Sequence, residues 1–283
     1  MIRIQFFAWI MLVGMALTGC SQSTKNGSQQ LAEMDVLERA VLADYRDSEE
    51  WGQVIGNELD LPDFSSVRTE GHVEIVYTQG DACSVKVFGN EKAIAQYAFD
   101  VDEETEVLNI KLDDYDYDGV GYFSARVPGI TVLITTPVLE RMEVYGAGDV
   151  DIDSELVQEE GLCIVVSGKG DVETRELDVQ SLDIEINGSG DVKVKKATCS
   201  GNIGFKLNGR GDLVAKVKCK NASIEVNGEG DVDLKVKCKV LNATCFGRGD
   251  VELSGECKTL NKKDGAAGSI NSRELKVDKI NLI

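Results

Sequence analysis

The chain has 283 residues, and 49 acidic against 30 basic side chains give it a formal net charge of -19 at pH 7. This length allows one large or two small domains with a buried core. The strong acidity argues against nucleic acid and against an anionic membrane surface as partners.

Residues 1–19 are predicted to be a lipoprotein signal peptide. Arg3 supplies a positive charge, and the apolar segment from Ile4 to Leu17 is shorter than the roughly 18 residues that a membrane span needs. The sequence Leu17-Thr18-Gly19-Cys20 resembles a bacterial lipobox. That resemblance implies cleavage before Cys20 and a lipid on this cysteine. The protein would then be exported and anchored to the outer membrane, on the periplasmic side or at the cell surface.

Residues 20–50 are predicted to comprise the lipidated cysteine and a tether. Ser21 to Gln30 is polar and flexible in composition. From Leu31 to Ser48 the apolar residues have helical spacing, which indicates either a short helix or a disordered stalk.

Residues 51–143 are predicted to form a strand-rich N-terminal part. Apolar and polar residues alternate in four segments: Val73–Tyr77, Ser84–Val87, Leu108–Leu112 and Ile130–Ile134. One helical turn is expected between Glu91 and Gln96.

Three aspartates in this part, Asp114, Asp116 and Asp118, match the first half of a calcium loop with Gly119 at its sixth position. The pattern asks for glutamate at the twelfth position, where Ala125 stands, and the flanking residues read as strands. An acidic surface loop is therefore the favoured interpretation. The three aspartates stay candidate metal ligands, and calcium is the one cofactor considered.

Residues 144–283 are organised by six copies of Gly-x-Gly-Asp. They are Gly146 to Asp149, Gly168 to Asp171, Gly188 to Asp191, Gly209 to Asp212, Gly228 to Asp231 and Gly247 to Asp250. The aspartates are separated by 22, 20, 21, 19 and 19 residues. A period in this range is typical of stacked repeats. We predict an all-β fold, a single-stranded parallel β-helix of 19–22 residues per coil.

The repeat also predicts the side chains that face inward. The residue after each aspartate is aliphatic and should form one buried ladder: Val172, Val192, Leu213, Val232 and Val251. The glycines are expected to supply dihedral freedom for sharp bends and to let neighbouring coils approach closely.

Cysteines follow the same period. Cys199, Cys219, Cys238 and Cys257 are 20, 19 and 19 residues apart, so they should occupy one position on successive coils. Parallel Cβ vectors suit a disulfide poorly. We therefore expect mostly free, buried thiols, and the absence of a Cys-x-x-Cys pair argues against zinc.

The six aspartates are predicted to have a structural role in the turns: Asp149, Asp171, Asp191, Asp212, Asp231 and Asp250. Stacked carboxylates repel one another. Turn backbone N–H groups that donate to each side chain would offset this repulsion as an Asx-type cap. A bound calcium ion is the alternative.

Several separate segments carry a family resemblance. Pro62-Asp63-Phe64, Val73 to Asp81, Pro137 to Val144, the Gly-x-Gly-Asp series and Gly268 to Leu275 resemble the putative auto-transporter adhesin, head GIN domain family of exported bacterial lipoproteins. The resemblance covers roughly Leu61 to Ile283. It implies a right-handed β-helix, a surface or envelope role and no catalytic residues.

The leading functional hypothesis is a non-enzymatic cell-envelope lipoprotein that displays a rigid solenoid for adhesion to, or binding of, a glycan or protein. His72 is the only histidine, and no catalytic triad can be assembled. The alternatives are a polysaccharide-active β-helix enzyme and a periplasmic scaffold. An enzyme could use the solenoid lysines, whose strand spacing instead indicates a solvated outer face: Lys193, Lys195, Lys216, Lys218, Lys235 and Lys237. The sequence leaves the ligand and the oligomeric state open.

Overall fold

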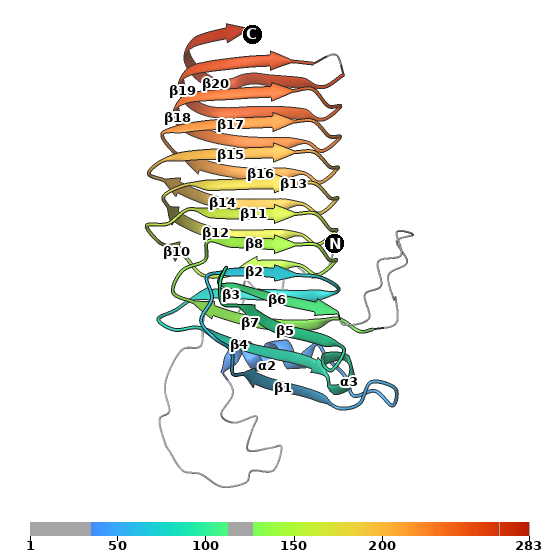
Figure 1. Cartoon of the computed structure of the whole chain (residues 1–283). Helices are drawn as coiled ribbons and strands as arrows, with labels where there is room; N and C mark the ends of the chain where they lie inside the picture. The colour runs from blue at the N-terminus through green and yellow to red at the C-terminus, as the bar shows by residue number, and fades with distance from the viewer. Residues whose placement is uncertain (1–34, 113–126, 266, 283) are drawn as a thin grey trace.

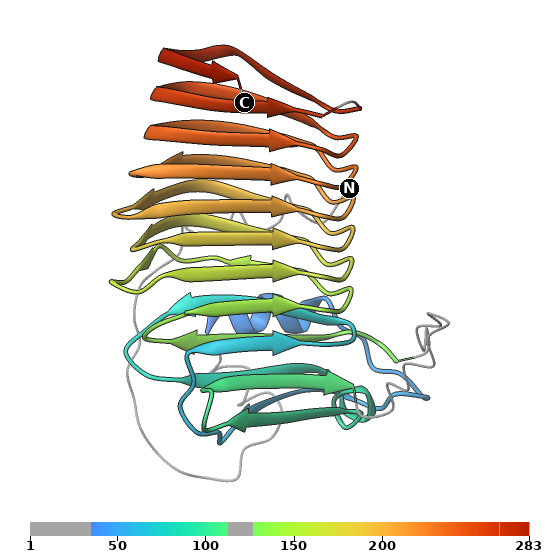
Figure 2. The same cartoon turned by 45° about the horizontal axis from the view of Figure 1, so that its top comes forward.

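A computed structural model describes residues 35–112, 127–265 and 267–282. Its strands lie one above another in a β-solenoid, with the N-terminal part at the lower end and the C-terminal strands at the upper end (Figures 1 and 2). The predicted lipidation site Cys20 and the calcium candidates Asp114, Asp116 and Asp118 lie outside the described residues.

Each coil of the repeat region contributes one strand to each of two parallel ladders. The first ladder contains β8 (Arg141–Val144), β11 (Leu162–Val166), β13 (Leu182–Ile186), β15 (Asn202–Leu207) and β17 (Asn221–Val226). The second contains β9 (Val150–Ile152), β12 (Val172–Val179), β14 (Val192–Cys199) and β16 (Leu213–Lys218), and the short β10 (Leu156–Val157) also pairs with β12. The Gly-x-Gly-Asp bends join the two ladders along one edge of the stack (Figure 1).

The last three strands are longer and pass around the corner between the ladders. They are β18 (Val232–Cys245), β19 (Asp250–Asp264) and β20 (Ser269–Leu282). The N-terminal half of β18 pairs with β16 and continues the second ladder. Its C-terminal half pairs with β17 and continues the first ladder. The predicted parallel stack of about 20-residue coils is confirmed.

The stack extends below residue 144 and does not follow chain order there. β2 (Ser66–Thr69) lies between β6 (Val107–Leu112) and β8, while β3 (Val73–Gln79) lies between β7 (Ile130–Thr136) and β9, all in parallel register. The coil formed by β6 and β7 therefore sits beneath the coil formed by β2 and β3, although it comes later in the chain. Part of the strand-rich N-terminal region thus belongs to the solenoid itself.

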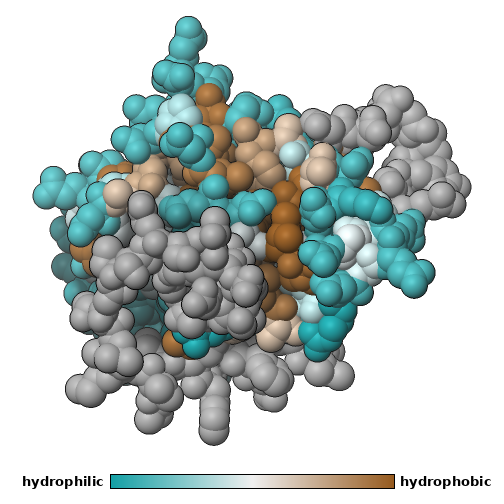
Figure 3. All heavy atoms as spheres, turned by 90° about the horizontal axis from the view of Figure 1, so that it is seen from below, coloured by the Kyte–Doolittle hydropathy of each residue, from teal (hydrophilic) through white to brown (hydrophobic). Residues whose placement is uncertain are grey.

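Antiparallel strands close the lower end. β4 (Ser84–Asn90) pairs with β7 and with β1 (Val54–Leu59), and β5 (Tyr97–Asp102) pairs with β6. Because β4 and β5 run antiparallel to their partners β7 and β6, the parallel series ends at the coil formed by β6 and β7. Seen from below, hydrophilic side chains form much of the visible rim around a strip of hydrophobic ones (Figure 3).

A short helix packs at this end. α2 (Val36–Ala43) begins with a capping box in which Asp35 and Glu38 exchange side-chain and backbone hydrogen bonds. Glu38 also pairs with Lys86 of β4. The helical alternative predicted for this segment is therefore found at residues 36–43, and the expected turn after β4 is α3 (Glu91–Ile94). No helix in the described ranges is both long and apolar enough to cross a membrane.

The aliphatic ladder predicted between the two faces is confirmed. Val172, Val192, Leu213, Val232 and Val251 follow one another in register, and none is more than 1 % exposed. Val150 extends the ladder downward and Ile270 extends it upward. Each such buried side chain contributes roughly 1.5–3 kcal/mol, so neighbouring coils stabilise one another without covalent links.

The glycines of the bends serve close approach and not an unusual backbone conformation. Among the described residues, positive φ angles occur at Gly52, Gly71, Gly89, Gly255 and Glu106, and no Gly-x-Gly-Asp glycine is among them. A Cβ on the first glycine of each copy would lie 1.9–2.0 Å from a carbonyl oxygen of the coil below. The expectation of special dihedral angles was therefore wrong, whereas that of close backbone contact is confirmed.

Gly209→Ala tests this constraint, because its Cβ would lie 1.9 Å from the Gly188 carbonyl oxygen. Backbone must move to make room, so we expect a loss of about 1–3 kcal/mol or more in the free energy of unfolding. Urea denaturation measures it. The matched control is Gly204→Ala in the same coil, where the obstacle at 2.5 Å is the movable Asp183 side chain. Equal losses in both variants would contradict the argument.

Candidate functional site: polar rows and a groove on the solenoid

The parallel register sorts outward side chains into rows that run along the stack. The aspartate row is the most regular: the backbone N–H of each aspartate donates to the Oδ1 atom of the aspartate one coil below, at 2.7–2.9 Å. The donors run from Asp171 to Asp250, and the Ser269 hydroxyl donates to Asp250 at the top. Each of these six carboxylates therefore accepts one hydrogen bond from the next coil.

This arrangement differs from the expected Asx-type cap, in which the donor would belong to the same turn. Stacking places the N–H of the next coil closer to each carboxylate, and a charged acceptor makes such hydrogen bonds strong. No group of three or more His, Cys, Asp or Glu side chains in the described ranges is arranged to hold a metal ion. Calcium binding by the row stays an untested alternative.

Asp191→Ala removes the acceptor for the Asp212 N–H group. We expect a loss of about 0.5–1.5 kcal/mol in the free energy of unfolding, because the freed N–H group can be solvated at this exposed edge. Asp191→Asn keeps an acceptor oxygen and should lose less. A thermal melt with and without calcium separates the two roles. Stabilisation of the original protein by calcium that is lost in Asp191→Ala would favour a metal site.

Asparagines form similar rows on the face of the first ladder. Side-chain amides of Asn208 and Asn227 donate to the asparagine one coil below, at 2.8 and 3.1 Å, and Asn261 and Asn281 repeat the pattern at 2.7 Å. An amide carries both a donor and an acceptor, so identical residues satisfy one another along the stack. Neighbouring coils are therefore joined by side-chain hydrogen bonds as well as by those of the backbone.

The cysteine row lies at the corner opposite the bends. Cys238 is in register with Cys257, and Cys199 stands one coil above Val179. All seven cysteines after Cys20 are free. Cys199, Cys245 and Cys257 are buried, but Cys83, Cys163, Cys219 and Cys238 are only half-buried, so the expectation of burial holds for part of the set. Burial raises the pKa of the Cys199 thiol to about 12, which keeps this thiol protonated and unreactive.

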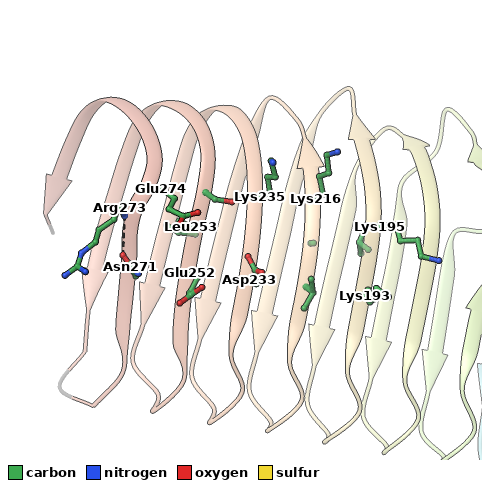
Figure 4. A pocket seen from close by; sticks show the side chains of 14 residues that line it. Lys193, Lys195, Lys216, Asp233, Lys235, Glu252, Leu253, Asn271, Arg273 and Glu274 are labelled. Carbon is green, nitrogen blue, oxygen red and sulfur yellow. Dashed lines mark hydrogen bonds between the residues drawn. The ribbon is translucent and has the colours of Figure 1, made fainter. Parts of the chain in front are cut away.

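A shallow open groove of about 650 Å³ crosses the second ladder from β14 to β20 (Figure 4). It lies between two irregularities in the strand pairing, one between Val194 and Ala197 and one between Glu252 and Ser254. The strands β14 and β20 each hold one extra residue at these points, whereas β16, β18 and β19 do not. The middle strands β16, β18 and β19, which lack this extra residue, form the floor of the groove.

The groove is lysine-rich at one end and carboxylate-rich at the other. β14 and β16 contribute Lys193, Lys195 and Lys216, and β19 and β20 contribute Glu252, Asn271, Arg273 and Glu274. β18 lies between them and contributes both Asp233 and Lys235 (Figure 4). The predicted solvated outer face is thus also the lining of a concave surface.

A separate acidic cluster lies below the groove on the same face. Asp151 of β9 neighbours Glu173 of β12, and Glu173 pairs with Lys193 and Lys195. Partial burial, with repulsion from Asp153 and Glu173, raises the pKa of Asp151 to about 6. This carboxylate therefore titrates close to neutral pH.

Asp151→Asn should stabilise the protein at neutral pH. Because the folded-state pKa of about 6 exceeds the ordinary 3.8, the folded state holds the proton more tightly, and the contribution of Asp151 to stability falls as pH rises through this window. Removing the charge should raise the free energy of unfolding by on the order of 1 kcal/mol at about pH 7, after allowance for solvent screening, and by little at about pH 3.5. Urea denaturation at both pH values tests this. Equal changes at both would contradict it.

The single histidine is not part of a catalytic arrangement in the described residues. His72 is exposed at the bend before β3. Its backbone N–H donates to the Tyr97 hydroxyl oxygen at 3.3 Å, and the Tyr97 hydroxyl donates to its backbone carbonyl at 3.1 Å. Its position is therefore explained by backbone contacts at the lower end of the solenoid.

Comparison with known proteins places the chain in a family. Residues 63–232 and 204–282 match the family described as "Putative auto-transporter adhesin, head GIN domain", and the chain belongs to this family. A search among curated proteins gives no match.

Solved structures share the fold. A putative adhesin from Bacteroides fragilis is 23% identical, with a TM-score of 0.63 over 81% of this chain and 97% of that one. A putative adhesin from Parabacteroides distasonis is 17% identical, with a TM-score of 0.58 over 82% and 98%. A protein from the same species described as a putative lipid binding protein is 18% identical, with a TM-score of 0.58 over 84% and 99%. At these identities the similarity concerns the fold.

Proposed function

We propose that this chain is a non-enzymatic lipoprotein of the cell envelope whose β-solenoid displays a binding surface for adhesion. The observation that carries this proposal is the groove on the second ladder, because it gathers cations, carboxylates and an amide on a rigid parallel stack. Such a stack holds ligand-binding groups at fixed backbone spacing, which lowers the ordering cost of binding. Membership of a family described as adhesins supports the same role.

The anchor is proposed from the opening segment of the sequence. Arg3, the apolar segment and Cys20 provide the features of a lipidated export signal. One lipid-modified residue would hold the lower, N-terminal end of the solenoid towards the membrane through the tether, so that the coils extend away from it. The outer membrane is the proposed site.

Cys20→Ser tests the anchor. We expect this variant to lose incorporation of labelled palmitate and to leave the membrane fraction, because the acylated residue is gone. Cys83→Ser removes a different thiol and is the matched control. Retention of label in Cys20→Ser would contradict the proposal. Protease treatment of intact cells then shows which side of the membrane the solenoid faces.

Binding is tested by incubating the purified full chain with immobilised envelope polysaccharides, host glycans and matrix proteins. We expect saturable retention on at least one of these materials without change to it. Release of new reducing ends from a polysaccharide, in the absence of any stable complex, would instead indicate an enzyme.

A further inference from the structure

We propose that the groove between β14 and β20 binds an acidic polysaccharide, with sugar carboxylates on the lysines and sugar hydroxyls on the acidic end. This inference rests on the proposed binding function and names the ligand class that the groove fits.

The first argument concerns two unpaired cations. Lys216 and Lys235 are in register on neighbouring strands, both are exposed, and neither forms an ion pair with any residue that the structure describes. Neighbouring strands are about 4.8 Å apart, and like charges directly opposite each other destabilise a sheet. An anion that lies between the two ammonium groups would relieve this repulsion.

Several other lysines of this face already have partners, and Lys218 of β16, which also has no ion pair among the described residues, does not line the groove. Lys193 and Lys195 pair with Glu173, Lys196 pairs with Glu176, and Lys237 pairs with Glu256. The pairing leaves Lys216 and Lys235 as the central free cations of the groove. An incoming carboxylate would therefore meet them first.

The second argument concerns the acidic end. Asp233 and Glu252 are in register on β18 and β19, and Asn271 follows on β20. Ionised carboxylates accept hydrogen bonds only, and an amide both accepts and donates. The two carboxylates would repel a ligand made solely of anionic groups, but they can accept hydrogen bonds from sugar hydroxyls. A ligand that carries carboxylates and hydroxyls in alternation satisfies both ends.

One exposed apolar side chain belongs to the lining. Val214 is 47% exposed between the basic and acidic residues, in register with Lys193 and Asp233. It offers a surface for the C–H face of a sugar ring. The residues that line the groove include no aromatic side chain.

This composition separates a polysaccharide from other polyanions. Single-stranded nucleic acid is bound by aromatic stacking as well as by cations, and the lining supplies none. Anionic membranes attract clusters of protruding basic residues, whereas this surface is concave and its acidic end would repel a headgroup layer. A neutral glycan would leave Lys216 and Lys235 unmatched.

The shape suits an extended chain that lies along the solenoid axis. Lys195, Lys216 and Lys235 follow one another on β14, β16 and β18 (Figure 4). From β14 to β20 the groove crosses four strand spacings, or about 19 Å at 4.8 Å each. A linear polymer of uronic acids could therefore place several sugar units on one molecule.

The test uses the full chain, polygalacturonate as the probe and isothermal titration calorimetry. We expect the original protein to bind polygalacturonate with an affinity that falls as salt is raised. The double variant Lys216→Gln, Lys235→Gln should bind about tenfold more weakly or worse. Removal of two like charges should not unfold the protein, and circular dichroism checks this.

Lys220→Gln with Lys239→Gln is the matched control. These two lysines are also exposed on successive coils, lie just past the cysteine row and line no part of the groove. We expect less than about a twofold change in affinity for this control. An equal loss in both double variants would overturn the proposal, because the attraction would then be non-specific.

Three further probes exclude other ligands: neutral dextran, phosphatidylglycerol vesicles and single-stranded DNA. Binding to any of them as tight as to polygalacturonate, and lost in Lys216→Gln, Lys235→Gln, would overturn the assignment to acidic polysaccharide. If polygalacturonate does not bind but the immobilised materials still retain the protein, the groove assignment fails and the proposed function stands. If no material retains the protein, both fail.

Discussion

The structure depends on backbone contact between coils that leaves no room for a side chain at the bends. The carbonyl oxygen of one glycine occupies the space where the Cβ of the next coil would be, so the two glycines of each bend must recur at the same point. That contact sets the register of both ladders. Once the register is set, each coil places its aliphatic residues on those of its neighbours, and the core becomes one continuous column.

The same register determines what the surface can carry. Identical residues on successive coils become neighbours, and the outcome depends on their chemistry. Asparagine side chains hydrogen-bond to one another along their rows, and the aspartate row is stabilised because each carboxylate accepts a hydrogen bond from the coil above. Lysine rows have no such internal solution. Lys216 and Lys235 form no ion pair among the described residues, and they are the cations to which we assign the proposed ligand.

The periodic features of the fold could be predicted from the sequence because they repeat. The 19- to 22-residue spacing predicted the parallel stack, the ladder from Val172 to Val251 and the common position of the cysteines. The lower end was harder. The insertion of the β2–β3 coil above β6 and β7 depends on pairing between segments distant in the chain, and hydrophobic alternation in β4 does not say that its partners are β1 and β7.

The groove was also missed, although the sequence contains a signal for it. From Asp191 to Cys199 there are eight steps along the chain, but from Asp212 to Cys219 there are seven, and the next two coils also have seven. The extra residue in β14 causes the irregular pairing at one side of the groove. A comparison of spacings within the repeat, and not only between repeats, would have indicated it. The charge pattern of the groove depends on which residues face each other across neighbouring strands. Lys216 and Lys235 are 19 residues apart in the sequence, and the strand pairing places them side by side.

The two ends of the solenoid differ, and this difference has an evolutionary consequence. Antiparallel strands terminate the lower end, whereas β20 is the last described strand above, with Ile280 and Leu282 exposed. Interior coils contact only the coils directly above and below, so duplication or deletion of one unit would leave the remaining contacts intact. Molecular height could then change in increments of about 4.8 Å, and relatives of different reach could arise without redesign of either terminus.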